Sequence, residues 1–312
     1  IHIRMNTCLK CLEPLDIADA HYGLHKPCFF GWFKCDALAE FTGLQKKSAD
    51  SRGPEDKTNP RSYNTSFFHG KFKKYSAELA GTSYIFKMRE SEAPELPEVE
   101  YLCNQIADAL GVPVANHFLI EFFGDRVFVT QNFIKKGGAQ ANLSHIYHFV
   151  GPEEPYSCET LIRTISAQTQ RPYDVEIFVQ TCLFDSLVGN HDRHGRNLGL
   201  VVTPTRIALS PIYDNVSYLS LESGPMLQAD FSPAGKVATS TEQSPTIKAY
   251  VQEFIRLGMG DLVLAFHSKI KLAKIIALID RSFCSAMMKD AIKRLVTKRY
   301  QEFSDELATR RE

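Results

Sequence analysis

The 312-residue sequence has no excess of charge of either sign: Lys and Arg together number 36, and so do Asp and Glu. A protein that coats nucleic acid through bulk charge is strongly basic, so we expect no direct nucleic-acid binding. Long apolar runs are also missing, because a run such as LVLAF at 262–266 is far too short to span a bilayer. The first residues lack the apolar stretch of a secretory signal peptide. These absences predict a cytoplasmic protein without membrane contact.

Two common phosphate-binding motifs are absent as well, since the sequence contains neither G-x-G-x-x-G nor a Walker A motif. The eight cysteines are scattered through a chain too long to need disulfide staples, which favours a reducing compartment. Apolar residues make up 44% of the sequence, enough for one large domain or two lobes with a substantial core.

One loop carries the main functional signal, and it reads GNHDRHGRN from 189 to 197. Four residues separate Asp192 from Asn197, which is the D-x-x-x-x-N spacing of a kinase catalytic loop, and Asp214 follows in LSPIYDNVS. In phosphoryl transfer, one carboxylate orients the attacking hydroxyl, while an amide oxygen and a second carboxylate hold magnesium. The spacing predicts Asp192 as the catalytic residue and Asn197 and Asp214 as magnesium ligands. The alternative is that all three are ordinary loop residues that bond nearby backbone groups.

The surroundings of this loop predict a mainly helical lobe over residues 135–312. In YDVEIFVQTCLFDSLVGN the apolar residues recur at helical spacing, which predicts one buried face and a firm anchor for the loop that follows. Two short β-like runs, VVT and RIAL, come next, and we expect three or four helices from Thr246 on. The glycine-rich stretch KKGGAQAN at 135–142 separates this lobe from residues 61–134.

Residues 61–134 predict a small β-rich lobe. The run TSYIFKM is typical of a strand, and Lys87 inside it lies on the solvent face or is held by a partner. Kinases use such a lysine to hold the phosphates of ATP, braced by a helix glutamate. A helix is predicted over PEVEYLCNQIADALG, from which Glu98 or Glu100 could face Lys87. The strands HFLIEFF and RVFVTQNFI follow as a hairpin turning at Gly124–Asp125.

A basic loop precedes the strand of Lys87. Gly70 lies there among lysines that include Lys74, and Thr65 and Ser66 come just before it. Such a loop could meet phosphate, although it lacks the glycines of the usual phosphate cradles. The alternative is a basic hairpin with no ligand.

Residues 1–60 form a Cys/His segment and a connector. Cys8, Cys11, His25 and Cys28 make a C-x2-C-x13-H-x2-C array, and two close pairs of soft ligands can close a tetrahedral zinc site. The alternative is that the cysteines are small apolar residues and His25 is a surface residue. His21 and Cys35 are further candidates for the ligand set.

The order of these segments resembles the HipA-like serine/threonine kinases, the toxin kinases of bacterial toxin–antitoxin modules, and in particular the short HipT type of HipBST modules. The segments that carry this resemblance are YIFKM, PEVEYLCNQIADALGVPV, VFVTQNF, GNHDRHGRN and LSPIYDN, and it extends over about residues 63–300. The resemblance implies an α+β, two-lobed protein-kinase-like fold and a kinase that uses ATP and Mg²⁺.

The resemblance also implies a role for individual residues. Asp192 matches the catalytic aspartate, Asn197 and Asp214 the metal ligands, Lys87 the phosphate-holding lysine and Glu100 its partner. The remaining matches are Gly70 and Lys74 in the G-x-x-x-K of the Gly loop, Gln131 and Phe133 beside adenine, and Ser66 near the autophosphorylated serine. An extra residue between Ser66 and Gly70 leaves Thr65 open as the phosphate acceptor.

For partners, the resemblance implies a protein substrate in translation, such as an aminoacyl-tRNA synthetase, and a DNA-binding antitoxin. Longer members carry a folded subdomain ahead of the Gly loop. We therefore expect a bare apolar surface on residues 60–135 and a separate small antitoxin protein that docks there. The alternative is that residues 1–60 cover this surface themselves. Two other functions stay open: a phosphoinositide-type lipid kinase, because of DRH-x-x-N, and an inactive kinase fold that serves as a scaffold or DNA-binding partner.

Overall fold

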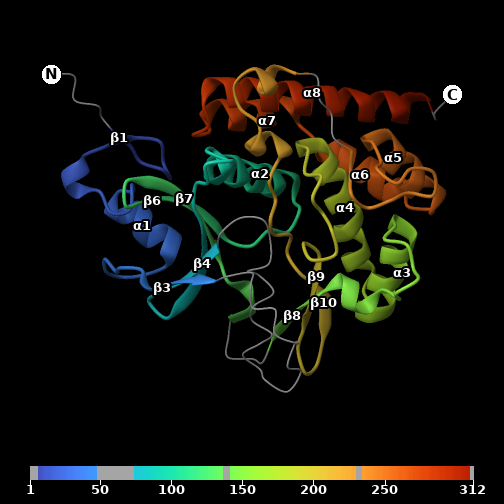
Figure 1. Ribbon diagram of the computed structural model, residues 1–312, viewed down its shortest axis with the longest axis horizontal. Helices are drawn as coiled ribbons and strands as arrows, with labels where there is room; N and C mark the ends of the chain where they lie inside the picture. Colours follow the sequence, from blue (N-terminus) through green and yellow to red (C-terminus); the bar gives the residue numbers. More distant parts are fainter. Residues whose placement is uncertain (1–5, 48–73, 136–140, 230–233, 310–312) are drawn as a thin grey trace.

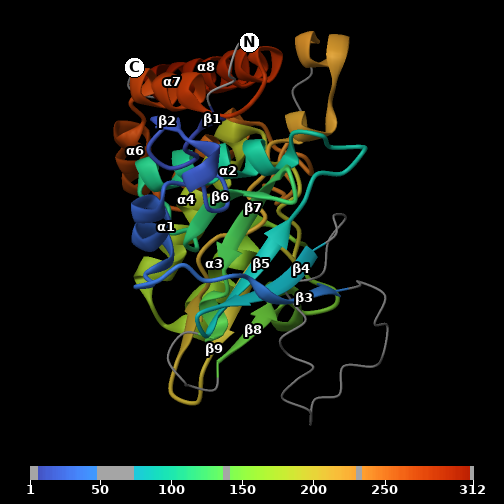
Figure 2. The same ribbon diagram turned by 90° about the vertical axis from the view of Figure 1, so that its left-hand side faces the viewer.

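The computed structural model in Figure 1 describes residues 6–47, 74–135, 141–229 and 234–309. Thr65, Ser66 and Gly70 of the expected Gly loop lie outside these residues. The described parts form a small β-rich lobe and a larger, mainly helical lobe (Figures 1 and 2), which confirms the two-lobed α+β architecture that the sequence predicts.

The small lobe is built on one antiparallel sheet with the strand order β3-β4-β5-β7-β6. The strands are β3 (Thr42–Lys47), β4 (Lys74–Leu79), β5 (Thr82–Lys87), β6 (His117–Phe122) and β7 (Asp125–Gln131). The register places Lys87 opposite Lys74 on one side and opposite Phe128 on the other. Because directly opposite residues of an antiparallel pair point to the same face, both lysines leave the sheet together.

The hairpin between β6 and β7 turns one residue earlier than the sequence suggests. Phe123 and Gly124 have φ values of 51° and 83°, and Asp125 already pairs with Phe122 across the two strands. Two successive left-handed residues are typical of a two-residue hairpin turn. Phe123 is 90% exposed, and its ring lies edge-on to that of Phe122, with the ring centres 4.6 Å apart.

Helix α2 (Leu96–Leu110) connects the sheet to the rest of the molecule. Pro97 lies in its first turn, and Gly111 ends it in the left-handed conformation, as the sequence predicts. The helix packs against β6 and β7 on one side and against α7 (Leu272–Arg281) on the other. Most of its side chains are therefore buried, including those of Glu98 and Glu100.

The N-terminal segment covers the outer face of the sheet, which is the face that carries Tyr84. It consists of β1 (Asn6–Thr7), β2 (Pro14–Leu15), the short turn η1 (Ile17–Asp19) and α1 (Lys26–Phe33). The ring of Phe33 in α1 lies 4.7 Å from that of Phe118 and 5.6 Å from that of Tyr84. Trp32, the one tryptophan of the sequence, lies 5.5 Å from Phe118. The expectation of a bare apolar surface here is wrong, because the chain's own aromatic residues bury it.

The chain then enters the sheet itself, since β3 pairs with β4 as an edge strand. This strand lies within the stretch 1–60 that the sequence sets apart as a segment and connector. The lobe boundaries expected after residues 60 and 134 stay predictions.

The large lobe is organised around α4 (Pro172–Val188). The helices α3 (Cys158–Thr169), α5 (Ile247–Arg256), α6 (Gly260–Lys269) and α8 (Ala286–Thr309) pack against it. All of α4 from Val175 to Val188 is buried except Glu176. The sequence predicts a single buried face for this helix, whereas the structure buries nearly all of its surface because other helices pack around it. The helices expected after Thr246 are α5 to α8, which confirms that part of the prediction.

A second, small sheet lies next to the lobe junction, with the order β10-β9-β8. Its strands are β8 (Asn142–His145), β9 (Gly199–Val202) and β10 (Ile207–Leu209), and short helical turns occur at η3 (Phe133–Lys135), η4 (Ile146–Phe149), η5 (Tyr218–Leu221) and η6 (Gly224–Gln228). An apolar cluster of Ile85, Ile134, Leu143 and Tyr213 joins the two lobes. Of the helices in the described ranges, none combines the length and apolar character needed to cross a membrane.

Candidate active site at the lobe junction

Lys87, at the end of β5, is held by two carboxylates. Its Nζ lies 2.5 Å from Oε1 of Glu100 on α2 and 2.7 Å from Oδ1 of Asp214, and only 4% of the residue is exposed. The structure thus selects Glu100 over Glu98 as the partner of Lys87. Glu98 points elsewhere and pairs with Arg89 and Arg126.

Asp214 is the meeting point of both lobes. It has a left-handed backbone with φ of 54°, and Lys74 Nζ donates to both its carboxylate oxygens at 2.9 and 2.7 Å. Burial alone would raise the pKa of Asp214, but the charges of Lys74 and Lys87 outweigh it and hold that pKa well below its usual range. Burial would lower the pKa of Lys87, yet Asp214 and Glu100 more than offset this and raise it.

The lysines and carboxylates line a small cavity together with apolar side chains that include Ile85, Phe128 and Ile212. Its volume is about 20 Å³, which is room for roughly one water molecule. The ammonium group of Lys74 contacts the carboxylate of Asp214, which the sequence predicts as a magnesium ligand. Lys74 contacts both oxygens and Lys87 also contacts Oδ1, so a cation can reach Oδ2 only after Lys74 has moved away.

In the predicted catalytic loop, the carboxylate of Asp192 and the side-chain oxygen of Asn197 are both able to accept a further contact. The side chain of Asp192 is 61% exposed, and Nε2 of His194 lies 3.7 Å from its Oδ1. Asn197 donates from Nδ2 to the backbone oxygen of Asp192 at 2.8 Å. The other side-chain atom, Asn197 Oδ1, is buried and has no hydrogen-bond partner among the described residues. A buried amide oxygen without a partner is costly, and a bound cation would satisfy it.

Arg193, which the sequence reasoning missed, holds this loop in place. It is fully buried and donates to both carboxylate oxygens of Asp185 on α4, at 2.7 and 2.8 Å. Its Nη1 also donates to the backbone oxygens of Asn197 and Tyr213, at 2.8 and 2.7 Å. One nitrogen therefore fixes the backbone of the loop and of the segment that ends in Asp214.

The same hydrogen-bond network reaches the small lobe. Arg193 Nη2 donates to Asn215 Oδ1 at 2.7 Å, and Asn215 Nδ2 donates to Asn104 Oδ1 on α2 at 3.0 Å. Asn104 in turn donates to the backbone oxygen of Glu100 at 2.8 Å. The sequence signal that could have revealed this network is Asp185, an acidic residue within the apolar run CLFDSLV of α4.

Phe133 and Gln131, the two residues expected beside adenine, have side chains in different places. Phe133 stands near the apolar junction, with its ring 6.3 Å from that of Tyr213. The side chain of Gln131 accepts a hydrogen bond from Asn116 at 2.7 Å and lines a different pocket, on the outer side of β7. Thr130, one residue earlier, faces the cavity of the lysines instead. The structure thus brings Phe133 to the site, but not the side chain of Gln131.

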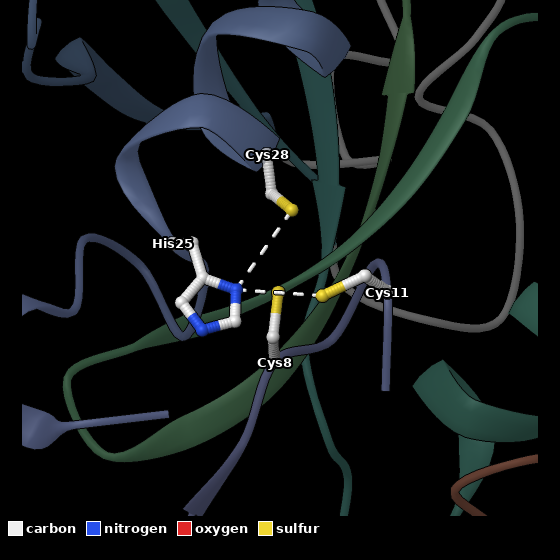
Figure 3. Close-up of side chains that lie close together, drawn as sticks. All are labelled: Cys8, Cys11, His25 and Cys28. Atoms are coloured by element: carbon white, nitrogen blue, oxygen red, sulfur yellow. Dashed lines mark hydrogen bonds between the residues drawn. The ribbon is translucent and has the colours of Figure 1, made fainter. Parts of the chain in front are cut away.

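The predicted zinc ligands converge at a separate place (Figure 3). Cys8, Cys11, His25 and Cys28 point toward one another, and their ligand atoms all lie within 4.8 Å of each other. Burial would raise the pKa of the Cys8 thiol, but backbone N–H groups of Cys11, His25 and Lys10 lower it to about 6. The further candidates do not join: among the described residues, the cluster contains neither His21 nor Cys35.

Comparison with known proteins agrees with this arrangement. The kinase CtkA of Helicobacter pylori, described as proinflammatory, superposes with a TM-score of 0.64 at 19% identity, over 76% of this chain and 93% of that one. HipA of Shewanella oneidensis, solved with HipB and operator DNA, superposes with a TM-score of 0.53 at 19% identity. That match covers 78% of this chain but only 62% of the Shewanella protein.

These likenesses confirm the kinase-like fold. A search of curated proteins by sequence finds no match. The HipA-like C-terminal domain, in contrast, matches residues 42–298, which include every residue of the lobe junction described above. The chain therefore belongs to the family of proteins with a HipA-like C-terminal domain.

Proposed function

We propose that the chain is a serine/threonine protein kinase that uses ATP and Mg²⁺. The observation that carries the proposal is the convergence of Lys87, Glu100 and Asp214 at the lobe junction, with Asn197 and Asp192 on a loop fixed to the same network. Family membership and fold support a phosphotransferase in general terms. The choice of a protein hydroxyl as acceptor is the more specific part of the proposal.

Asn197 and Asp214 suit Mg²⁺, which prefers oxygen ligands. The buried and unpartnered Oδ1 of Asn197 and the carboxylate of Asp214 are the oxygens that would hold it. When bound, Mg²⁺ neutralises negative charge on the phosphates of ATP. Lys87 neutralises further phosphate charge, and its ion pair with Glu100 keeps the ammonium group in place.

Asp192 is the residue we assign to the acceptor hydroxyl. Its exposed carboxylate can meet a side chain that arrives from solvent. It would accept the proton as the hydroxyl oxygen bonds to the γ-phosphorus of ATP, the bond from that phosphorus to the bridging oxygen breaks and ADP leaves. The apolar junction of Ile85, Ile134 and Leu143 offers a surface on which the adenine ring can be buried. Phe133 lies beside this surface, whereas Gln131 would contribute through its backbone.

We also propose that the kinase is the toxin of a toxin–antitoxin module. The proposal rests on the family and on the likeness to Shewanella HipA, which was solved with its antitoxin HipB and operator DNA. The protein substrate would be a component of translation, such as an aminoacyl-tRNA synthetase, and Ser66 or Thr65 would accept phosphate in autophosphorylation. A DNA-binding antitoxin would be one partner. That the chain itself touches no nucleic acid stays a prediction.

A small antitoxin protein would be the second partner. Because the N-terminal segment covers the outer face of the sheet, such a protein would have to bind another part of the small lobe.

The test is phosphate transfer from labelled ATP by purified wild type and by Asp192→Asn. We expect the substitution to slow transfer to protein by about 10²–10⁴-fold, because it removes the proton acceptor. Asp261→Asn, at an exposed position in the first turn of α6, is the matched control and should keep full activity. Mass spectrometry of the same samples reads phosphate on Thr65 and Ser66.

Two outcomes would contradict the proposal. Undiminished transfer by Asp192→Asn would remove the assigned role of that residue. Transfer to phosphoinositide vesicles, with none to protein, would replace the protein kinase by the lipid kinase. Comparing the phosphoproteins of cells that express wild type and Asp192→Asn then identifies the substrate.

A further inference from the structure

Four soft ligands meet in the N-terminal segment, on the side of the small lobe away from its cavity. Cys8 and Cys11 come from the turn between β1 and β2, and His25 and Cys28 come from the start of α1 (Figure 3). Cys11 Sγ lies 3.4 Å and Cys28 Sγ 3.9 Å from His25 Nδ1. Tetrahedral zinc, with bonds of about 2.3 Å to sulfur and about 2.0 Å to nitrogen, separates its ligands by roughly 3.5–3.8 Å.

The other nitrogen of His25 is already engaged. Its Nε2 lies 3.0 Å from the backbone oxygen of Pro14, and a carbonyl can only accept a hydrogen bond. Nε2 therefore carries the proton, which leaves the lone pair of Nδ1 facing the three thiols. Metal-binding histidines are commonly held in this way, with one ring nitrogen on a carbonyl and the other on the metal.

Backbone hydrogen bonds present the two N-terminal cysteines on one side of a tight turn. Leu12 N donates to Cys8 O at 3.0 Å, and Cys8 N donates to Glu13 O at 2.9 Å. Leu12 has φ of 67°, a conformation that an L residue adopts only when its surroundings impose it. Leu9 N also donates to Gly23 O at 3.0 Å, which ties the turn to the residues just before His25.

Among its described residues, the segment has no hydrophobic core separate from that of the small lobe. Its elements are short, and its apolar side chains are buried against the sheet of the small lobe and not in a core of their own. Segments of this size commonly need a metal or disulfides, and Cys8, Cys11 and Cys28 form no disulfide. Three thiols and one imidazole form a closed set of the kind that structural zinc prefers over hard cations.

We propose that Cys8, Cys11, His25 and Cys28 hold one structural Zn²⁺ that clamps the turn 8–13 to the start of α1. The clamp fixes α1, and with it the rings of Phe29 and Phe33, against the outer face of the sheet. The metal takes no part in phosphoryl transfer.

The test is the metal content of the full chain, purified under reducing conditions without added metal. We expect about one zinc per chain in the wild type and in Cys35→Ser, the matched control from the same segment. Cys11→Ser and Cys28→Ser should lose most of the zinc, whereas His25→Cys should retain it because a thiolate replaces the imidazole. Replacing zinc by Co²⁺ in the wild type should give the visible and thiolate-to-metal absorption of a tetrahedral site.

Thermal unfolding adds a readout that does not depend on activity. Removing the metal from the wild type with a chelator should lower Tm, and returning Zn²⁺ should restore it. Wild type that holds far less than one metal ion per chain and gives no tetrahedral Co²⁺ spectrum would overturn the proposal. So would full zinc content in Cys11→Ser, or a disulfide between two of these cysteines in the native protein. None of these results depends on whether the chain is a kinase.

Discussion

At the scale of single residues, Asp214 shows how the site tolerates buried charge. Its carboxylate contacts Lys74 and Lys87, so that two buried ammonium groups face Asp214 and Glu100. Such a group of charges is stable only while it is balanced, because removing one partner leaves another buried and unpaired. Lys74 thus contacts, in this structure, the carboxylate that we propose as a ligand of Mg²⁺.

We predict from this balance that Asp214→Asn lowers the free energy of unfolding at pH 7 by about 3–5 kcal/mol. The folded-state pKa of Asp214 lies below its unfolded value of about 3.9, so the contribution is fully present above that pH. It is lost as the pH falls from about 4 toward the folded-state pKa. Urea unfolding of wild type and variant between pH 7 and pH 3 should show a difference that is constant at first and then shrinks.

The control for this measurement is Asp192→Asn, the same chemical change at a side chain that is 61% exposed. It should leave stability almost unchanged at every pH. A stability difference for Asp214→Asn that persists undiminished at pH 3 would contradict the assigned ion pairs.

The two glutamates of α2 allow a second prediction at this scale. Glu100 and Glu98 are both buried, but only Glu100 contacts Lys87. Glu100→Gln should reduce kcat/KM for ATP by about 10²-fold, because a misplaced Lys87 no longer meets the phosphates. Glu98→Gln should leave it within a few-fold of wild type. The measurement is steady-state kinetics of both variants, each assayed well below its own Tm. Equal losses of kcat/KM in the two variants would argue that α2 acts only through its packing.

At the scale of elements, the loop that carries Asp192 and Asn197 depends on α4, to which Arg193 joins it. Arg193 joins the loop to Asp185 of α4 and to Asn215, and through Asn104 to α2. Helix α4 is itself buried on nearly all sides, so it is a rigid support. The core of the large lobe therefore fixes the positions of Asp192 and Asn197.

This dependence can be measured with a double-mutant cycle on Asp185 and Arg193. Each single substitution, Asp185→Leu or Arg193→Met, leaves one buried charge unpaired and should cost about 3–5 kcal/mol. The double variant removes both charges and should cost clearly less than the sum of the two. Denaturant unfolding of the four proteins gives the coupling energy. Additive losses would mean that the two side chains act independently.

Much of this level of organisation follows from local sequence. The caps Pro97 and Gly111 mark the ends of α2, and the run around Lys87 marks β5, because a few neighbouring residues decide such features. The contact between Lys74 and Asp214 joins residues 140 positions apart, and no local pattern encodes it. For the same reason the role of Arg193, the pocket that the side chain of Gln131 lines and the burial of nearly all of α4 became visible only in the folded chain.

At the scale of the whole molecule, the small lobe contacts the N-terminal segment on one side and the large lobe on the other. The N-terminal segment lies on the outer face of the small sheet, and the other side of that lobe meets the large lobe through α2 and the cluster around Tyr213 (Figures 1 and 2). The sequence raised this cover only as an alternative to a partner protein, since an aromatic-rich segment fits either arrangement. The family match begins at residue 42, so the residues of the cover precede it.

The seat of α1 on the sheet also gives the protein an optical reporter of its own. Trp32 is the one tryptophan of the sequence, and it lies against Phe118 and Tyr101, with the ammonium group of Lys10 5.8 Å from its ring centre. The wavelength of indole emission follows the polarity around the ring. Tryptophan fluorescence of this chain therefore reports whether the N-terminal segment is seated, whereas circular dichroism reports mainly the helices of the large lobe. The two signals together distinguish the release of one segment from unfolding of the whole protein.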